Sequence, residues 1–337
     1  MLEQRSPRST REWTTVFFGS GAFSVPVLEA LLRGPARVSA VVTRPDQPAG
    51  RGRRARPTPV KALAAQRGIA VLEPKRVNAP EAVAQVRELA PELIVLAAYG
   101  QLLGGGLLSI ARIAPLNVHP SLLPKYRGAA PVPWAILRGE RETGVSVIRM
   151  TEEVDGGQIL TQEATAIGED ETAGELEARL ALLGARLLGE TLGRLEQALA
   201  QARPQGPAPT DGSAQAPRLT KGEGQVDWRL SAEAICRRVR GLAPWPGAYS
   251  FLRHDGRLLR LKLLRVSTSE GASGEPAGTV VQLLPDTLLV QAGEGLVALR
   301  EVQPAGGRVM DVAAFQRGHQ VKQGDVFVDS AASGEPS

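Results

Sequence analysis

Apolar and polar positions along residues 14–118 follow the pattern of strands that alternate with helices. Short apolar runs typical of buried strands lie at residues 14–18, 37–43, 93–98 and 115–118. The stretches between them, at residues 25–33, 60–67 and 80–89, are typical of helices, and each opens at or beside a proline. This alternation predicts an α/β fold, a Rossmann-like parallel sheet that is covered on both faces.

The pattern changes twice farther along the chain. Residues 144–150 alternate like a strand, and residues 175–199 carry leucines at helical spacing, which predicts one long helix that packs by its leucine stripe. Pro, Gly, Ala and Ser then dominate residues 203–216 and predict a linker. A short helix at residues 231–240 and five apolar runs predict a small antiparallel β-barrel, OB-like, after the linker. These runs lie at residues 248–252, 258–266, 278–284, 287–292 and 296–302.

The predicted organisation is therefore a tail at residues 1–12, a Rossmann-like domain at 13–202, a linker at 203–216 and a barrel at 217–330. With 43% hydrophobic and 22% charged residues, the 337-residue chain can bury two cores, which excludes disorder as its main state. Its apolar runs are too short to cross a membrane, since a span needs about 18 residues. The polar N-terminus lacks the apolar core of a signal peptide, so we expect a cytoplasmic protein.

Cysteine and histidine are too sparse for a metal or disulfide framework. Cys236 is the single cysteine, and His119, His254 and His319 are the only histidines and lie far apart in sequence. We therefore expect no internal disulfide and no metal site. No apolar stripe is left over after the core is assigned, which favours a monomer.

Arginine is concentrated in one segment, at residues 44–61. The chain has 40 basic and 35 acidic residues and a pI near 9.7, a mild excess that tolerates a polyanionic partner. Gly and Pro predict that the segment stays out of helix and strand as a flexible, solvated arm. It is either an ordinary charged loop or an arm that grips phosphates, with salt-dependent binding. Its arginines are Arg44, Arg51, Arg53, Arg54 and Arg56.

Two patterns could carry chemistry near the strand ends. Gly19, Ser20 and Gly21 follow the first strand, where backbone amides can hold a phosphate, but a dinucleotide fingerprint would need glycine at Ser24. The alternative is a tight turn that needs glycine for a positive φ. A sharper signal comes from Asn117 and His119, which lie two apart at the end of a buried strand and so project from one face.

Asp155 follows 36 residues after His119 in a glycine-flanked turn that can return its carboxylate to the strand ends. An amide and an imidazolium placed at a carbonyl oxygen that gains charge can contribute about 3–4 kcal/mol. Asn117 and His119 suit that task. Asp155 would orient or charge the imidazole and relay a proton.

At these residues the sequence resembles the methionyl-tRNA formyltransferases, within the wider formyl-tetrahydrofolate transferase group. The matching stretches are NVHPSLLPKYRGAAP, TRPDQPAGRG, AAYG, the Asp155 turn, VDWRLSAEAI and PWPGAY, and they span nearly the whole chain. The resemblance implies formyl transfer from 10-formyltetrahydrofolate to the α-amino group of initiator methionyl-tRNA, with no metal. It implies catalytic roles for Asn117, His119 and Asp155.

The resemblance also implies where the substrates bind. The folate would lie beside Ser121, Leu122, Leu123 and Pro124, near Tyr99 and Gly100, while Arg44, Arg51, Arg53, Arg54, Arg56 and the barrel would reach the tRNA. Three other hypotheses stay open on the residues alone. The first is a formyltransferase acting on a small amine such as glycinamide ribonucleotide or an amino sugar. The others are an NADP-dependent reductase and a non-catalytic RNA-binding protein, the last disfavoured because only 4% of residues are aromatic.

Overall fold

The computed structural model describes residues 12–49, 54–271 and 273–328, and the predicted tail at 1–12 lies almost wholly outside them. Internal contacts divide the described chain into two compact units. The first contains the residues up to Pro131, Glu142–Ala166 and Leu176–Pro217, and the second contains Val132–Arg141, Ile167–Glu175 and the residues from Arg218 on. Because the units interleave along the chain, the contiguous boundaries drawn from the sequence remain a prediction.

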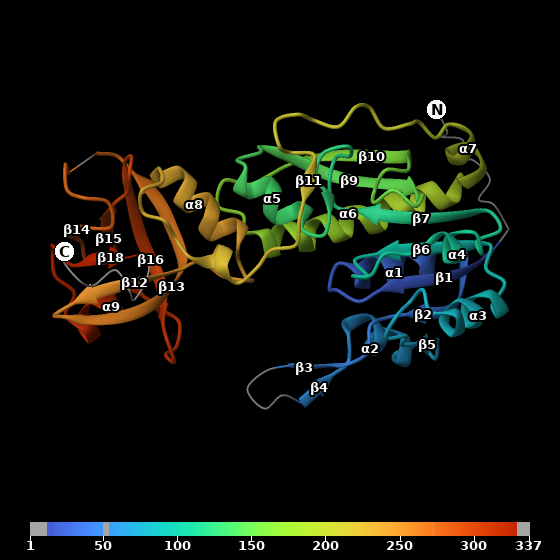
Figure 1. Cartoon of the computed structure of the whole chain (residues 1–337), viewed down its shortest axis with the longest axis horizontal. Helices are drawn as coiled ribbons and strands as arrows, with labels where there is room; N and C mark the ends of the chain where they lie inside the picture. The colour runs from blue at the N-terminus through green and yellow to red at the C-terminus, as the bar shows by residue number, and fades with distance from the viewer. Residues whose placement is uncertain (1–11, 50–53, 272, 329–337) are drawn as a thin grey trace, which may run out of the picture. The chain divides into compact units, whose positions relative to one another are not determined.

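A seven-stranded sheet in the order β10-β9-β7-β6-β1-β2-β5 forms the centre of the first unit (Figure 1). Its first five strands along the chain run parallel, as the α/β pattern predicts, while β9 pairs antiparallel with β7 and β10 antiparallel with β9. The carboxyl ends of β1, β6 and β7 therefore meet at one edge. The strands are β1 (Trp13–Gly19), β2 (Ala36–Val42), β5 (Ala70–Leu72), β6 (Leu93–Ala97), β7 (Ala114–His119), β9 (Glu142–Arg149) and β10 (Gln158–Ala166).

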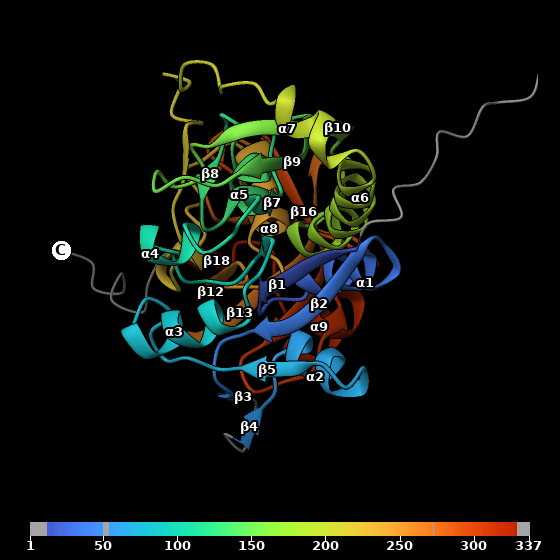
Figure 2. The same ribbon diagram turned by 90° about the vertical axis from the view of Figure 1, so that its right-hand side faces the viewer.

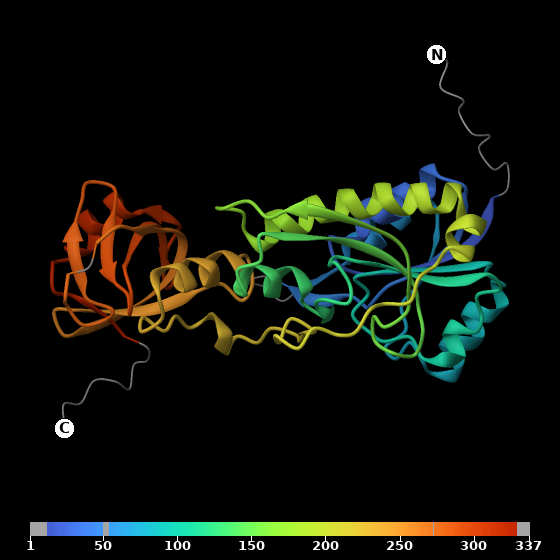
Figure 3. The ribbon, with the colours of Figure 1, turned by 90° about the horizontal axis from the view of Figure 1, so that it is seen from above.

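Helices cover both faces of this sheet. Figures 2 and 3 show α1 (Ser24–Arg33) and α6 (Ala173–Gly193) on one face and α3 (Pro80–Glu88) and α4 (Gly105–Leu108) on the other. α6 lies directly on the strands, since a β carbon at Gly184 would be 2.8 Å from Cγ1 of Val118. Within the described residues, no helix is both long and apolar enough to cross a membrane. The remaining helices are α2 (Pro59–Gln66), α5 (Pro131–Leu137), α7 (Leu195–Ala200), α8 (Ala232–Gly241), α9 (Val312–His319) and the 3₁₀ turn η1 (Gly222–Gly224).

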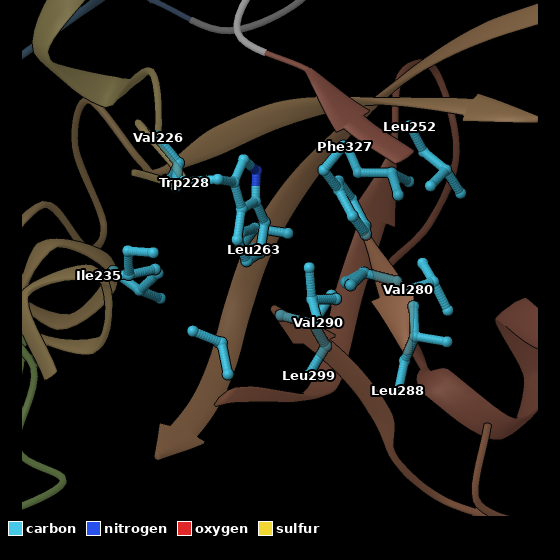
Figure 4. Packing of buried hydrophobic residues seen from close by; sticks show 14 of the residues in the cluster. Val226, Trp228, Ile235, Leu252, Leu263, Val280, Leu288, Val290, Leu299 and Phe327 are labelled. Carbon is cyan, nitrogen blue, oxygen red and sulfur yellow. The ribbon is translucent and has the colours of Figure 1, made fainter. Parts of the chain in front are cut away.

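The second unit contains an antiparallel sheet in the order β14-β15-β16-β13-β12-β18, with β17 beside β16. Thr279 bridges Val326, so the two ends of the strand order pair with each other and curl the sheet into the predicted barrel. Trp228 packs against Phe327 at the centre of its core, with ring centroids 5.0 Å apart (Figure 4). The strands are β12 (Tyr249–His254), β13 (Arg257–Ser269), β14 (Val280–Leu283), β15 (Leu288–Gln291), β16 (Leu296–Pro304), β17 (Met310–Asp311) and β18 (Val326–Val328).

Two predictions about local structure are wrong. The single helix predicted over residues 175–199 is broken into α6 and α7 at Arg194, whose backbone leaves the helical region directly after Gly193 (φ −134°, ψ 36°), and glycine is a poor helix former. Part of the arginine-rich segment, predicted to lack strands, forms an antiparallel hairpin of β3 (Gln47–Ala49) and β4 (Arg54–Arg56). Pro48 fits there because a two-stranded ribbon leaves its missing N–H on an outer side.

Candidate active site

Asn117 and His119 lie at the carboxyl end of β7, between β6 and β9. Both side chains are buried, with relative exposures of 6% and 4%. Their spacing of two residues places them on the same side of the strand, as the sequence predicts. The sheet therefore delivers an amide and an imidazole to the edge where open parallel sheets bind their ligands.

Asp155 completes this cluster from the turn between β9 and β10. Its backbone adopts a positive φ of 50°, which returns the carboxylate toward β7. The Asn117 amide donates to its Oδ1 over 3.0 Å, and the backbone N–H of Gly128 donates to its Oδ2 over 2.9 Å. Nδ1 of His119 lies 3.6 Å from the same Oδ2. The structure thus brings together the three side chains that the sequence singles out.

A backbone carbonyl fixes the proton arrangement of His119. Its Nε2 lies 2.9 Å from the carbonyl oxygen of Tyr126, and a carbonyl can only accept. Nε2 therefore carries a proton, and Nδ1 is the atom that faces Asp155. Tyr126 and Gly128 could not be identified as site residues from the sequence, because both act through main-chain atoms.

The loop Ser121–Pro124, predicted to lie beside the folate, is held by internal bonds. Ser121 is 1% exposed and donates to the Lys125 carbonyl over 2.7 Å, and Leu123 is 3% exposed. Leu122 and Pro124 are half-buried. Contact of these four residues with a cosubstrate remains a prediction, and the bonds of Ser121 serve to fix the loop that follows His119.

Tyr99 and Gly100 form a turn after β6, beside Arg44. Gly100 has φ +89°, a conformation that favours glycine, and a β carbon there would lie in ordinary contact with Cζ of Arg44, at 3.4 Å. Burial raises the pKa of Tyr99 to about 12, and the nearby Arg44 guanidinium partly opposes this. Among the described residues, the Tyr99 hydroxyl has no hydrogen-bond partner.

The buried Tyr99 hydroxyl makes stability sensitive to alkali. An unfolded tyrosine ionises near pH 10, whereas folded Tyr99 keeps its proton to about pH 12, so stability falls as pH rises through this window. Between pH 8 and pH 11 we expect the free energy of unfolding to drop by about 1.4 kcal/mol more in the unmodified chain than in Tyr99→Phe. Urea unfolding of both at each pH measures this difference. Equal drops in the free energy of unfolding of the two proteins would mean that water solvates the Tyr99 hydroxyl in the folded state.

Two exposed apolar side chains lie on adjacent loops, one of which carries Asp155. Leu102 is 66% exposed after the Tyr99 turn, and Val154 is 42% exposed directly before Asp155. The loops are adjacent, because Met150 packs against the core cluster that contains Tyr99 and the Glu152 carboxylate lies against Gly105. Exposed apolar residues beside buried polar groups are typical of a site for a partly apolar ligand.

Two amides of the first glycine turn are already bonded within the protein. The N–H groups of Ser20 and Gly21 both donate to the carbonyl of Ala98, over 3.2 Å each. The interpretation of this turn as one that needs a positive φ is also wrong, since neither Gly19 nor Gly21 adopts one. Gly19 is required by close packing, because a β carbon there would lie 2.6 Å from Cε1 of Phe17.

The predicted tRNA-binding arginines occupy different places. Arg44 is exposed beside Gly100, and Arg56 is exposed at the end of β4. Arg54 begins β4, while Arg51 and Arg53 lie outside the described residues. Lys61 anchors the base of the hairpin through ion pairs of 2.9 Å with both Asp46 and Glu73, which raise the pKa of Lys61.

No cluster of metal ligands accompanies the site. Over the part of the chain that the structure describes, no group of three or more His, Cys, Asp and Glu side chains is arranged to hold a metal ion. The polar groups of the cluster are instead paired with one another and with the backbone.

Solved structures share the fold of this chain. An N-formyltransferase from Helicobacter canadensis, solved with folinic acid and dTDP-3-aminofucose, matches 85% of this chain and 98% of its own with a TM-score of 0.61 at 15% identity. HypX from Aquifex aeolicus, solved with tetrahydrofolic acid, matches 90% of this chain with a TM-score of 0.58 at 16% identity. This chain spans about half of HypX, 47% of its length.

Relatives matched by sequence share a higher identity with this chain than these solved structures do. Residues 14–192 match the formyl transferase family and residues 218–320 match the formyl transferase C-terminal domain. The methionyl-tRNA formyltransferase of Citrifermentans bemidjiense is 42% identical over 94% of this chain and 97% of its own, and that of Pelobacter propionicus is 43% identical over 94% and 96%. The chain therefore belongs to the formyl transferases, in the family of the methionyl-tRNA formyltransferases.

Proposed function

We propose that this chain transfers the formyl group of 10-formyltetrahydrofolate to the α-amino group of methionine on initiator methionyl-tRNA, for translation initiation. The observation that carries the proposal is the cluster of Asn117, His119 and Asp155 at the end of β7, in a chain whose relatives bear this activity in their names. An amide, an imidazole and a carboxylate supply the donors and the proton acceptor that acyl transfer to an amine requires.

Asn117 and His119 stabilise the oxygen of the formyl group as the amine attacks its carbon. Asn117 has two amide hydrogens, and one is engaged with Asp155, so the second is available to the developing oxyanion. In its charged form, the His119 imidazole supplies the second donor at the same edge, where its Nδ1 lies 3.6 Å from the Asp155 carboxylate. Two such donors lower the activation free energy of the transfer by about 3–4 kcal/mol.

Asp155 accepts the proton that the amine loses. The bond from the methionine nitrogen to the formyl carbon forms, the bond from that carbon to N10 of the folate breaks, and the proton passes through the carboxylate to N10. Asn117, Gly128 and His119 hold the carboxylate in place for this transfer. Because a free α-amino group has a pKa near 7.7, much of the nucleophile is unprotonated at neutral pH, and positioning matters more than a strong base.

The folate binds beside the loop Ser121–Pro124 and the turn of Tyr99 and Gly100. Leu102 and Val154 offer exposed apolar surface for a planar ring on the adjacent loops, and Asp155 follows Val154 directly. Arg44 supplies positive charge at the same turn. This places Arg44 between the folate turn and the arginine hairpin, so it can serve either substrate.

The hairpin and the barrel bind the tRNA. On the outer face of the barrel, Phe251 pairs across the strands with Arg260, and the Arg260 guanidinium lies 4.0 Å from the ring centre of Tyr249. Aromatic rings beside arginines form the kind of surface that holds nucleic acid by stacking and by charge. A monomeric state and a cytoplasmic location remain predictions.

The test is transfer of labelled formyl from 10-formyltetrahydrofolate by the purified protein. Initiator methionyl-tRNA, uncharged tRNA, free methionine, glycinamide ribonucleotide and a dTDP-amino sugar are offered in parallel. We expect label on the charged tRNA alone. Label on a small amine in place of the tRNA would identify a different formyltransferase, and no transfer to any acceptor would overturn the proposal.

Removal of charge from the hairpin is expected to weaken tRNA binding. In Arg54→Ala/Arg56→Ala the KM for tRNA should rise several-fold at about 0.15 M salt, and its logarithmic salt dependence should flatten by about 0.7–0.9 for each phosphate that the variant no longer neutralises. The KM for the folate should not change. Arg33→Ala/Arg67→Ala removes two exposed arginines elsewhere and is the matched control. An unchanged salt slope in the hairpin variant would contradict the assignment.

A further inference from the structure

Residues 203–216, which the composition marks as a linker, are bound along the catalytic loops of the first unit. We call them the strap. Arg203 exchanges two backbone hydrogen bonds with Ile159, of 3.0 and 2.8 Å. At the other end, β11 (Gln215–Ala216) pairs with β8 (Arg127–Gly128), and the Tyr126 N–H donates to the Ser213 carbonyl over 2.7 Å. The strap therefore touches both the turn that carries Asp155 and the loop that follows His119.

Gln205 uses every hydrogen-bonding position of its side-chain amide within this region. Its Nε2 donates to the carbonyl oxygens of Asp155 and Gly157, over 2.6 and 2.8 Å. Its Oε1 accepts from Nε and an Nη of Arg127, over 3.1 and 2.7 Å. Arg127, 13% exposed, also pairs with Glu153. One side chain of the strap thus connects the backbone of the Asp155 turn to β8.

The Asp155 turn needs such support because of its backbone conformation. A non-glycine residue at φ +50° is strained, although aspartate tolerates this region better than most residues. The two bonds from Gln205 hold the carbonyls of Asp155 and Gly157 on either side of Gly156. These bonds fix the direction in which the Asp155 side chain leaves the turn.

The strap also contacts the backbone groups that hold Asp155 and His119. The Gly128 N–H bonds the Asp155 carboxylate, and Gly128, at φ +119°, lies so close to the strap that a β carbon would be 2.8 Å from the Ala216 oxygen. Tyr126, whose carbonyl accepts from His119, has φ +60° and is held by Ser213. Both partners of the catalytic pair therefore depend on backbone that the strap fixes.

We propose that the strap orients the active site and that Gln205 is a positioning residue for Asp155 and, through it, for His119. The proposal rests on the proposed function for its kinetic consequence, but the geometry of the His119 and Asp155 pair is measurable without activity. Gln205 touches no reacting atom. It holds the backbone from which the proton acceptor projects, and a shift of about 1 Å at such a site can cost 100-fold in rate.

Two substitutions distinguish the role of the Gln205 amide nitrogen from that of its amide oxygen. Gln205→Ala removes all four bonds. Gln205→Glu keeps an oxygen for Arg127 but replaces the donor by a carboxylate oxygen that the two carbonyls repel, so it breaks the hold on the Asp155 turn. Gln215→Ala is the matched control, because Gln215 lies in the same strap with an exposed side chain and pairs through its backbone alone.

Single-turnover transfer measures the kinetic effect in the full chain. We expect Gln205→Ala and Gln205→Glu to slow the chemical step by about 10- to 100-fold, with KM values for both substrates within about twofold and an altered pH profile. Gln215→Ala should match the unmodified chain. A role in stability alone would instead lower Tm and leave the rate of the folded protein intact.

Imidazole NMR provides the readout that does not need activity. The chain has three histidines, so the His119 ring signals can be assigned by comparison with His119→Ala. We expect both Gln205 variants, and not Gln215→Ala, to move these signals. Moved signals in a chain that transfers no formyl group would uphold the positioning role and defeat the proposed function. Unmoved signals, or a single-turnover rate within twofold of the unmodified chain in both Gln205 variants, would overturn the positioning role.

Discussion

In Asp155→Asn, single-turnover formyl transfer is expected to fall by about 10²- to 10⁴-fold, the range that loss of a positioned proton acceptor produces. The substitution keeps the size of the side chain, and the asparagine oxygen can still accept from the Gly128 N–H. It removes the carboxylate that lies 3.6 Å from His119 and that we propose takes the proton from the amine. We therefore expect a loss in the chemical step with little change in substrate binding.

The comparison for Asp155→Asn is Asp286→Asn, the same chemical change at a side chain that is 77% exposed in the second unit. That variant should transfer formyl at the rate of the unmodified chain. A rate near that of the unmodified chain in Asp155→Asn would show that the proton leaves by another route, directly to solvent or to the folate.

Trp228→Ala is expected to lower the free energy of unfolding of the barrel by about 3–5 kcal/mol, because a buried aromatic residue leaves a cavity that its neighbours fill only in part. Trp228 is 2% exposed, packs against Phe327 and donates from its indole nitrogen to the Ser250 hydroxyl over 2.9 Å (Figure 4). The substitution removes the apolar area, the ring contact and the hydrogen bond together.

Hydrogen exchange measured by mass spectrometry can assign the effect of Trp228→Ala to one unit. Protection of peptides from β12, β13 and β16 should fall by at least 100-fold, while peptides from β1, β6 and β7 serve as an internal reference. Trp245→Ala makes the same change at a tryptophan that is 53% exposed and should leave both sets unaltered. Equal protection of the barrel in the two variants would mean that its core closes without Trp228.

The juxtaposition of Asn117, His119 and Asp155 could be predicted from the sequence because it follows from strand geometry. A spacing of two places Asn117 and His119 on one side of β7, and a glycine-flanked turn allows Asp155 to return to them. The strands β1, β2, β6 and β7 and the helices α1, α2 and α3 follow from apolar periodicity in the same way. Each of these signals is local, so a single sequence carries it.

The hairpin and the strap could not be predicted on the same grounds. The β3 and β4 strands form a two-stranded ribbon, so they lack the alternation that a buried sheet face imposes. The strap binds mainly through backbone groups and the amide of Gln205, which leave no periodic pattern, and its Pro and Gly content is what a free linker would also show. The bond from Gln205 to the Asp155 carbonyl connects residues about 50 positions apart and is seen only in the folded chain.

The last strand of the barrel has a consequence for the order in which the chain is made. β18 pairs with β12, and Phe327 and Asp325 hydrogen-bond to Gly278 and Val280 over 2.8 Å each, so this strand joins the two edges of the sheet. Until it leaves the ribosome, both edges present unpaired amides and carbonyls that can recruit strands of other nascent chains. A chain shortened before Val326 would keep these open edges permanently, and we expect it to self-associate even though most of the barrel core is already present.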